Sequence, residues 1–435
     1  MRHAFPLEKS SVREYPPVNG DPNMAVDRGF GDKRPGYLFV LPWSFSVLTG
    51  GVNQVVFNLA REMQRTGCYD PIVLCGDWNA TEPIWDEVHG IRTVRWRIQP
   101  FDPDASWKAR GAYWFWEKRF RERFAQFCAE LRICAVNLHY VGPLAFTLDR
   151  FRRRCSPTLP LLLSFHGKDI TDLQDASSKT IRRWRECLLR ASAAVVCSKD
   201  LGDRLVLAVD GAVAPAIVYN GIDMEYFTSL RRGAPRPMQG RYILSVGRFQ
   251  WKKGQDVLIG AFAEISEEYP DIDLVLVGAS DVALPSLRDL CVRKGVERRV
   301  HFFPDRPHEE IPDFLRNAVL FALPSREEPF GIVLAEAGAL GVPIVASAVG
   351  GVLELVVHGR TGFLVPPDAP ADLAHALRTI LNDPVASRKM GERMRDRVAV
   401  EFTWQDALTK YRAITEAARV TAMFDAGSDG AAEDI

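Results

Sequence analysis

The stretch Ala318-Val-Leu-Phe-Ala-Leu-Pro-Ser-Arg-Glu-Glu-Pro-Phe-Gly-Ile-Val-Leu-Ala-Glu336 joins a strand, a loop and the start of a helix. Its first six residues are apolar and predict a strand that is covered on both faces. Pro329 disfavours the α region for Glu328, so we expect that carboxylate on the loop at the carboxyl end of the strand. Gly331 then begins a helix whose first amide groups lack internal partners and carry partial positive charge.

The two carboxylates of this stretch, Glu328 and Glu336, are expected at separate places in the site. Glu336 lies more than a helical turn beyond Gly331, too far around the helix to share a proton with Glu328. A helix N-terminus binds phosphate, and the flanking carboxylates can accept hydrogen bonds from hydroxyl groups. The pattern therefore suits a nucleotide-sugar. A helix that is merely capped by an acidic loop residue is the alternative.

Length and composition indicate an ordinary soluble protein. The 435 residues are enough for two domains, and the 47% hydrophobic and 25% charged residues are typical of globular chains. The net charge of zero does not point to a nucleic-acid partner. The eight cysteines contain no C-x-x-C pair, which favours reduced core thiols in a cytosolic protein over a disulfide frame or a zinc site. No apolar run approaches the ~18 residues of a membrane span.

Both ends of the chain differ in composition from the rest. Residues 1–36 are polar, rich in proline and without the apolar core of a secretion signal, so we expect a poorly ordered extension. Residues 424–435 are acidic and rich in small residues, which predicts a disordered tail.

Short apolar strands alternate with helical stretches, which predicts an α/β protein with two doubly wound, Rossmann-like domains facing a cleft. We expect an N-terminal domain over residues 37–230, a linker over 231–240 and a C-terminal domain over 241–402. Ligands of such domains bind at the carboxyl ends of the strands. Dinucleotide oxidoreductases share this architecture, so the fold class leaves the function open. The predicted strands are 37–42, 71–75, 91–96, 135–139, 161–165, 193–197 and 217–219, then 242–246, 274–277, 300–303, 319–323, 344–346 and 363–365.

A glycine pair, Gly50 and Gly51, follows the first strand and precedes a helix. Glycines allow close approach of a ligand, and the helix offers its N-terminus to an anion. The pair is not a G-x-G-x-x-G fingerprint, which weighs against a nicotinamide or flavin enzyme. A plain glycine turn is the alternative.

A basic loop follows the first strand of the second domain and contains Arg248 and Lys253. A glycine and a helix predicted over 255–269 come next. One forked donor and one point charge at the carboxyl end of a strand would clamp a diphosphate.

His166 directly follows a strand of the first domain, on the side where the cleft is expected. A histidine there favours a functional role over a structural one. His139 is a similar residue at the end of a strand, for which a hydrogen-bonded loop histidine is slightly favoured over a functional role. Lys168 and Asp169 are weaker candidates for contacts with an acceptor.

Several of these stretches together resemble glycosyltransferase family 4. The resemblance rests on Glu328-Pro-Phe-Gly with Glu336, on Gly247-Arg with Lys253-Gly, on His166 and on the turn Asn220-Gly-Ile-Asp223, where we expect left-handed backbone at Asn220-Gly221. Further landmarks in the same order are 349–355, 359–367 and Phe402-Thr-Trp404, so the resemblance covers residues 37 to 420. The departures are the N-terminal extension and Lys252, where the family commonly has glutamate.

The resemblance implies a retaining, metal-independent enzyme of the GT-B fold that uses a nucleotide diphosphate-sugar and needs no other cofactor. It implies catalytic roles for His166, Arg248, Lys253 and Glu328, with Arg248 and Lys253 on the leaving diphosphate and Glu336 on the ribose. The other implied donor contacts are Gly50, Gly51, Phe330, Gly331, Ile332 and Val333. It also implies a last helix, over 403–423, that crosses back to the first domain.

The acceptor implied is a saccharide or a lipid-linked saccharide used in cell-surface polysaccharide or glycolipid synthesis. Residues 101–190 hold 17 Lys/Arg against 10 Asp/Glu, together with several aromatics, and so suit an anionic membrane face on the cytoplasmic side. The alternative is solvated helices whose aromatic side chains belong to the core. A nucleotide-sugar epimerase, an oxidoreductase and a binding module stay open as other functions. The aromatics and cations of this segment are Trp107, Tyr113, Trp114, Trp116, Trp184 and Arg152-Arg-Arg154.

Overall fold

The computed structural model describes residues 34–45, 51–101, 105–229 and 236–429. Predictions for most of the N-terminal extension, for Gly50, for much of the linker and for the last six residues therefore lie outside the described chain.

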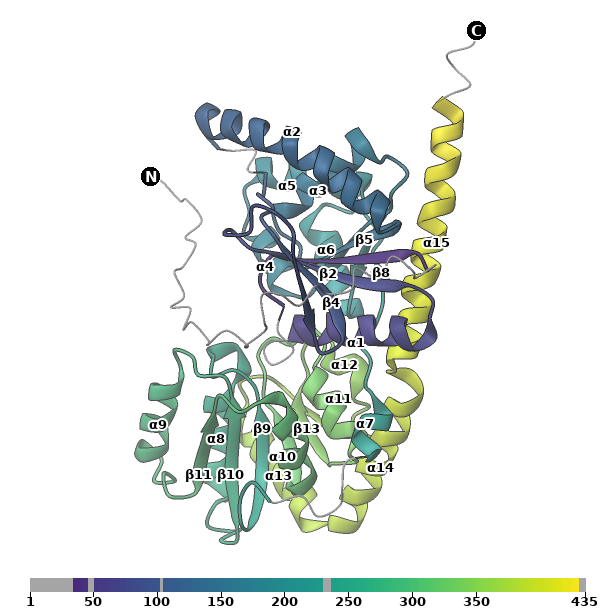
Figure 1. Ribbon diagram of the computed structural model, residues 1–435. Coiled ribbons are helices and arrows are strands. Elements are labelled where there is room, and N and C mark those ends of the chain that lie inside the picture. The colour runs from purple at the N-terminus through teal and green to yellow at the C-terminus, as the bar shows by residue number, and fades with distance from the viewer. Residues whose placement is uncertain (1–33, 46–50, 102–104, 230–235, 430–435) are drawn as a thin grey trace. The chain divides into compact units, whose positions relative to one another are not determined.

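Two sheets form the framework (Figure 1). The first has eight strands in the order β3-β4-β2-β1-β5-β6-β7-β8, and the second has six in the order β11-β10-β9-β12-β13-β14. Every neighbouring pair is parallel except β3 and β4. The strands are β1 Gly36–Leu41, β2 Asp70–Gly76, β3 Ile84–Val88, β4 Ile91–Trp96, β5 Ile133–His139, β6 Leu161–Phe165, β7 Ala193–Val196, β8 Ala216–Ile217, β9 Arg241–Val246, β10 Ile272–Gly278, β11 Val300–Pro304, β12 Leu320–Leu323, β13 Ile344–Ser347 and β14 Phe363–Val365.

Apolar side chains cover both faces of each sheet. Along β1, Leu38 and Val40 belong to one core, whereas Phe39 and Leu41 belong to another. Alternate side chains of a strand point to opposite faces, so continuous apolar runs are what two covered faces require. The fold therefore has two Rossmann-like α/β domains, as predicted.

Helices connect the strands of both sheets. Those of the first domain are α1 Gly51–Thr66, α2 Trp107–Glu130, α3 Leu144–Cys155, α4 Lys168–Gln174, α5 Ser178–Arg190, α6 Lys199–Ala208 and α7 Met224–Ser229. Those after β9 are η1 Trp251–Lys253, α8 Gln255–Ile265, α9 Leu284–Arg293, η2 His308–Glu310, α10 Ile311–Asn317, α11 Ile332–Ala339, α12 Val352–Leu355, α13 Pro370–Asn382, α14 Pro384–Glu401 and α15 Trp404–Asp429.

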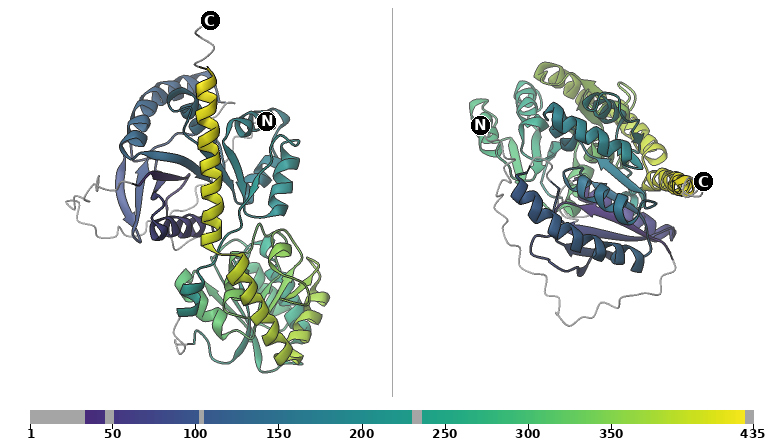
Figure 2. Two further views of the ribbon diagram at one scale, coloured as in Figure 1. Left: turned by 90° about the vertical axis from the view of Figure 1, so that its right-hand side faces the viewer. Right: turned by 90° about the horizontal axis from the view of Figure 1, so that it is seen from above.

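The long helix α15 returns to the first domain (Figures 1 and 2). Trp404 and Tyr411 are buried in the core that lies under β1, and the Tyr411 hydroxyl is 3.2 Å from Ser164 Oγ on β6. The crossing predicted from Phe402-Thr-Trp404 is thus present. The helix continues to Asp429, so the prediction of a helix end at 423 and of disorder from 424 was wrong as far as Asp429.

Three further expectations need correction. Strand β3 was not predicted, because its residues are half-buried or exposed and lack an apolar run. Helix α8 ends at Ile265 rather than 269. Neither Asn220 nor Gly221 has a positive φ. An added Cβ at Gly221 would lie 2.1 Å from the backbone nitrogen of Trp404, so a close approach of two backbones requires this glycine.

The basic aromatic segment divides into core and surface. Tyr113 and Trp184 are buried and Trp116 packs against the core, so these three were wrongly grouped with the surface residues. The arginines 152 and 153 pair with Asp149, and Arg154 pairs with Glu117. By contrast, Trp107, Trp114 and Phe115 on α2 are 79%, 62% and 79% exposed.

Candidate active site

Lys253 and Glu328 form the centre of the site. Strands β9 and β12 are neighbours in the second sheet, so the loops that follow them start side by side. Lys253 Nζ donates a hydrogen bond of 2.7 Å to Glu328 Oε2, and both side chains are largely buried. The sequence placed both residues on loops at strand ends, and the sheet order brings them together.

Glycines allow the loop that carries Glu328 to pack closely. The amide of Gly351 donates to the carbonyl oxygen of Glu328 over 3.0 Å, and an added Cβ at Gly350 would lie 2.2 Å from that oxygen. The glycine pair after Val349, noted only as a landmark in the sequence, thus holds the backbone of Glu328 in place.

Helix α11 begins beside this loop, as predicted. Gly331 caps it with a φ of 98°, Phe330 is buried, and Ile332 and Val333 are half-buried in its first turn. An added Cβ at Gly51 would lie 3.7 Å from Ile332 Cδ1, so the N-termini of α1 and α11 are close to each other. Two helix N-termini at one place form a binding region for an anion, because the first amides of a helix have no partners within the helix itself.

Arg248 is exposed at the carboxyl end of β9. Burial raises the pKa of Tyr140 in the first domain to about 12, and the charge of Arg248 opposes that shift. Such an effect requires the guanidinium to be close to the first domain. Among the described residues, no carboxylate forms an ion pair with it, so its charge is available to a ligand.

His166 and His139 form a pair at the ends of β6 and β5. His139 Nδ1 is 3.0 Å from His166 Nε2, and the two rings stack. Gly167, the next residue, packs so closely on Pro329 that an added Cβ would lie 2.4 Å from its Cγ. His166 is thereby held close to the loop of Glu328. His139 is hydrogen-bonded as expected, but it is the last residue of strand β5 and does not lie on a loop.

The surroundings of His139 determine how this pair shares its protons. Its Nε2 atom is buried and has no hydrogen-bond partner among the described residues. A buried N–H without an acceptor is more costly than an unpaired acceptor nitrogen, so His139 carries its proton on Nδ1 and donates it to His166 Nε2. Burial lowers the pKa of His166 to about 4 and, with His166 nearby, lowers that of His139 well below its ordinary value. Both rings are therefore neutral near pH 7, and His166 presents Nδ1–H as a donor.

Replacement of His139 tests this arrangement. We expect His139→Phe to lower kcat about five- to tenfold, since one hydrogen bond of about 1 kcal/mol that orients His166 is lost. His139→Asn retains an N–H donor near the position of Nδ1 and should recover most of the rate, with the donor KM little changed in both variants. Steady-state kinetics on the two proteins measure this difference, and equal rates would contradict the proton assignment.

Asp169 has a different role from the one expected. Its buried carboxylate accepts hydrogen bonds from the amides of Val141, His166, Gly167 and Ile170 over 2.8–3.2 Å. Burial raises its pKa to about 6, although these amides oppose the shift. Asp169 therefore holds the loop of His166, and Lys168 is exposed and pairs with Asp172. Of these contacts, only the hydrogen bond from the amide of Val141 joins residues that are distant in sequence.

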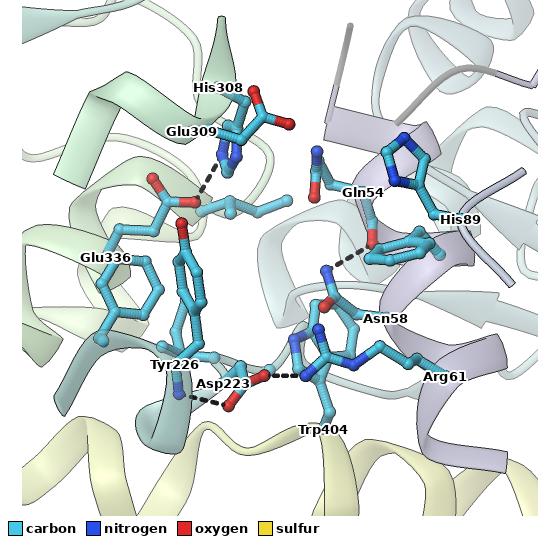
Figure 3. Close-up of a pocket in the computed structure, with 15 residues that line it drawn as sticks. Gln54, Asn58, Arg61, His89, Asp223, Tyr226, His308, Glu309, Glu336 and Trp404 are labelled. Carbon is cyan, nitrogen blue, oxygen red and sulfur yellow. Dashed lines mark hydrogen bonds and ion pairs between the residues drawn. The ribbon is translucent and has the colours of Figure 1, made fainter. Parts of the chain in front are cut away.

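Glu336 lines a cavity of 190 Å³ between α1 and α11 (Figure 3). His308 Nε2 is 3.0 Å from its Oε1, a partner that no sequence motif indicated. Burial lowers the pKa of His308, but the hydrogen bond and charge of Glu336 outweigh it, so the pKa is raised overall. Two of the predicted site residues, Ile332 and Glu336, line this cavity. The predicted catalytic residues do not line it; they are His166, Arg248, Lys253 and Glu328.

Comparison with known proteins identifies the family. Residues 49–226 match the profile described as Glycosyltransferase Family 4, and residues 227–397 match that of Glycosyl transferases group 1. The D-inositol 3-phosphate glycosyltransferase of Corynebacterium aurimucosum is 30% identical over 402 residues, which cover 83% of this chain and 89% of the relative. The chain belongs to glycosyltransferase family 4. The glycogen synthase of Mycobacterium tuberculosis is a further relative, 28% identical over 86% of this chain and 92% of its own.

Solved structures support the GT-B fold of this family 4 enzyme. The sucrose-phosphate synthase of Thermosynechococcus elongatus superposes with a TM-score of 0.69 at 25% identity, over 88% of this chain and all of that one. The Anabaena protein HepE, solved with UDP and glucose, gives 0.68 at 22% identity over 88% and 98%. The family 4 enzyme is thus a glycosyltransferase that uses nucleotide-sugar donors, and the epimerase and oxidoreductase alternatives are not favoured.

Proposed function

We propose that the protein transfers a hexosyl unit from a nucleotide diphosphate-sugar, with retention at the anomeric carbon, to a saccharide or lipid-linked saccharide. Arg248, Lys253 and the first amides of α11 bind the diphosphate. Glu328 and His166 contact the sugar, and Glu336 binds the ribose. The product belongs to polysaccharide or glycolipid synthesis at the cell surface.

The contact between Lys253 and Glu328 carries this proposal. It brings a cation for the diphosphate to within 2.7 Å of a carboxylate for sugar hydroxyls, beside the N-terminus of α11. In a nucleotide-sugar the diphosphate is bonded directly to the sugar. A cation and a carboxylate that lie side by side can therefore contact the diphosphate and the sugar hydroxyls of one ligand. The cavity that Glu336 lines then accommodates part of the nucleoside.

The energetic demand of the reaction is the charge that develops on the departing diphosphate. Lysine, arginine and helix amides directed at that charge stabilise the transition state more than the ground state. The acceptor attacks from the face that the diphosphate leaves, and a phosphate oxygen takes the proton of the acceptor. This route requires no nucleophile from the protein.

Thermal stability with UDP, GDP, ADP, dTDP and NAD, each near 1 mM, tests the donor class. A nucleotide at 100 times its Kd adds about 2.7 kcal/mol to the free energy of unfolding, which raises Tm by several degrees. We expect one nucleoside diphosphate to stabilise the protein and NAD to have no effect. Incubation with the matching nucleotide-sugar should then release that diphosphate and form a glycoside, whereas stabilisation by NAD alone would contradict the proposal.

The proposed reaction needs no divalent metal, because Arg248 and Lys253 provide the positive charge. We expect the rate of diphosphate release to stay within about twofold when excess chelator is added. A complete loss that Mg²⁺ or Mn²⁺ restores would show that the cations of the protein do not suffice.

The exposed part of α2 supports membrane contact on the cytoplasmic side. Trp107, Trp114 and Phe115 lie among Lys108, Arg110, Lys118 and Arg119, and aromatics among cations suit an anionic bilayer surface. No helix of the described residues has the length and hydropathy to cross a bilayer.

Vesicle flotation tests this contact. We expect binding to vesicles with an anionic lipid at low salt, and a loss of about tenfold or more when Trp114 and Phe115 are both replaced by Ser, since two aromatic side chains leave the interface. Flotation that is equal for both proteins, or absent at low salt, would remove the membrane from the proposal.

A further inference from the structure

A second cavity, of 340 Å³, lies in the first domain, away from the residues assigned to the donor. It is formed where the end of β4 and the segment before β3 meet the middle of α2. The residues that define its chemistry are Glu82, Trp96, Arg97, Trp116, Arg119 and Arg123.

Positive charge dominates this cavity, since three guanidinium groups face one carboxylate. Arg123 forms an ion pair with Glu82, which leaves two cations without a compensating acid. Arg97 has a buried Nε atom that has no hydrogen-bond partner within the described part of the chain, and Arg119 is exposed without an ion pair there. A buried donor without an acceptor is costly, and a bound anion would remove that cost.

The walls of the cavity are aromatic. Trp116 stacks on Phe120, and the guanidinium of Arg123 lies 5.9 Å from the ring of Trp96. Aromatic contacts hold arginine side chains in place and exclude water, which strengthens their hydrogen bonds to an anion. Guanidinium groups bind the oxygens of a phosphate in pairs, so phosphate is the anion that this arrangement fits best.

The cavity lies at the same edge of the first sheet as the histidine pair, in the domain where the acceptor is expected. Trp96 ends β4 at the same edge of the sheet where His139 ends β5. Two strands, β2 and β1, lie between them, which corresponds to about 14 Å at the usual strand spacing. A single sugar phosphate is shorter than this, so the phosphate belongs to a larger acceptor or to a lipid beside α2.

We propose that this arginine cavity binds a phosphate group, carried either by a soluble phosphorylated saccharide or by a lipid headgroup. Binding can be measured without turnover, so the proposal does not depend on the assigned reaction.

Calorimetry with inorganic phosphate and flotation with phosphatidylcholine vesicles that contain phosphatidic acid, at one ionic strength, provide the test. We expect Arg119→Gln and Arg97→Gln each to weaken binding about tenfold or more, since each removes a charge-assisted hydrogen bond. Lys294→Gln removes one exposed charge at the carboxyl end of α9, outside the cavity, and should change affinity less than threefold. Circular dichroism checks that each variant is folded. Arg119→Gln is the variant least expected to disturb the fold, because Arg119 is exposed.

The two assays separate the sources of the phosphate. If the arginine variants lose binding of inorganic phosphate in calorimetry, the ligand is a soluble phosphate compound. If they lose only flotation with the vesicles, the ligand is a lipid headgroup. Equal affinities of Lys294→Gln and Arg119→Gln, or no binding to wild type in either assay, would overturn the proposal. If Lys253→Ala removes phosphate binding and Arg119→Gln does not, the phosphate binds at the donor site. The proposal of a phosphate site in the arginine cavity is then wrong, but the proposed function is not affected.

Discussion

Replacement of Lys253 by Ala should lower kcat/KM by about 10²–10³, the usual effect of removing one group that stabilises developing negative charge. The loss has two causes. The diphosphate loses a cation, and Glu328 loses the hydrogen-bond donor that lies 2.7 Å away, so a largely buried carboxyl group beside the sugar has no partner at that oxygen. Initial rates of nucleotide release, with saturating acceptor, measure the effect.

Lys252 provides the matched control, because it is adjacent to Lys253 and has the same charge, but it forms no ion pair with a carboxylate of the described residues. Lys252→Ala should retain activity within about threefold, since the variant leaves the ion pair of Lys253 with Glu328 in place. Arg248→Ala is expected to resemble the Lys253 variant if both groups act on one diphosphate. Near-normal rates for Lys253→Ala in a folded protein would exclude the diphosphate clamp.

Replacement of Gly254 by Ala should lower the free energy of unfolding by about 2–5 kcal/mol and also impair turnover. Gly254 has a φ of 63°, and an added Cβ would lie 1.9 Å from the carbonyl oxygen of Pro324. Pro324 precedes the loop of Glu328, so the two loops must separate to admit a methyl group. Lys253 then moves away from Glu328. Thermal and urea unfolding measure the stability, and nucleotide release measures the rate.

Comparison with Gly295→Ala separates the two contributions to the loss of stability in Gly254→Ala, namely the strained backbone and the steric clash. Its φ is 71°, but an added Cβ would meet no described atom within 4 Å. Gly295→Ala should therefore cost only about 1–2 kcal/mol and leave activity unchanged. If the two alanine variants lose the same stability and keep the same rate, the close contact of the loops has no role in the site.

Much of the site could be predicted because its residues lie at the ends of apolar strands. The apolar runs of β9 and β12 and the local effects of Pro329 and Gly331 indicated where Lys253, Glu328 and the start of α11 would lie. Strand β3 was missed for the same reason, since its exposed residues carry no such pattern.

The sequence by itself determined the two α/β domains, their strands apart from β3, and the loops that hold the charged residues, because burial and backbone preferences act over a few neighbouring residues. Only the tertiary structure decided which of these groups meet. His139 reaches His166 because β5 and β6 are neighbours, Asp169 is buried by amides of its own loop and of Val141, and Gly221 is required by a chain segment near residue 404. The contacts between His139 and His166, between Val141 and Asp169, and between Gly221 and Trp404 join residues that are distant in sequence, and sheet order and packing bring them together.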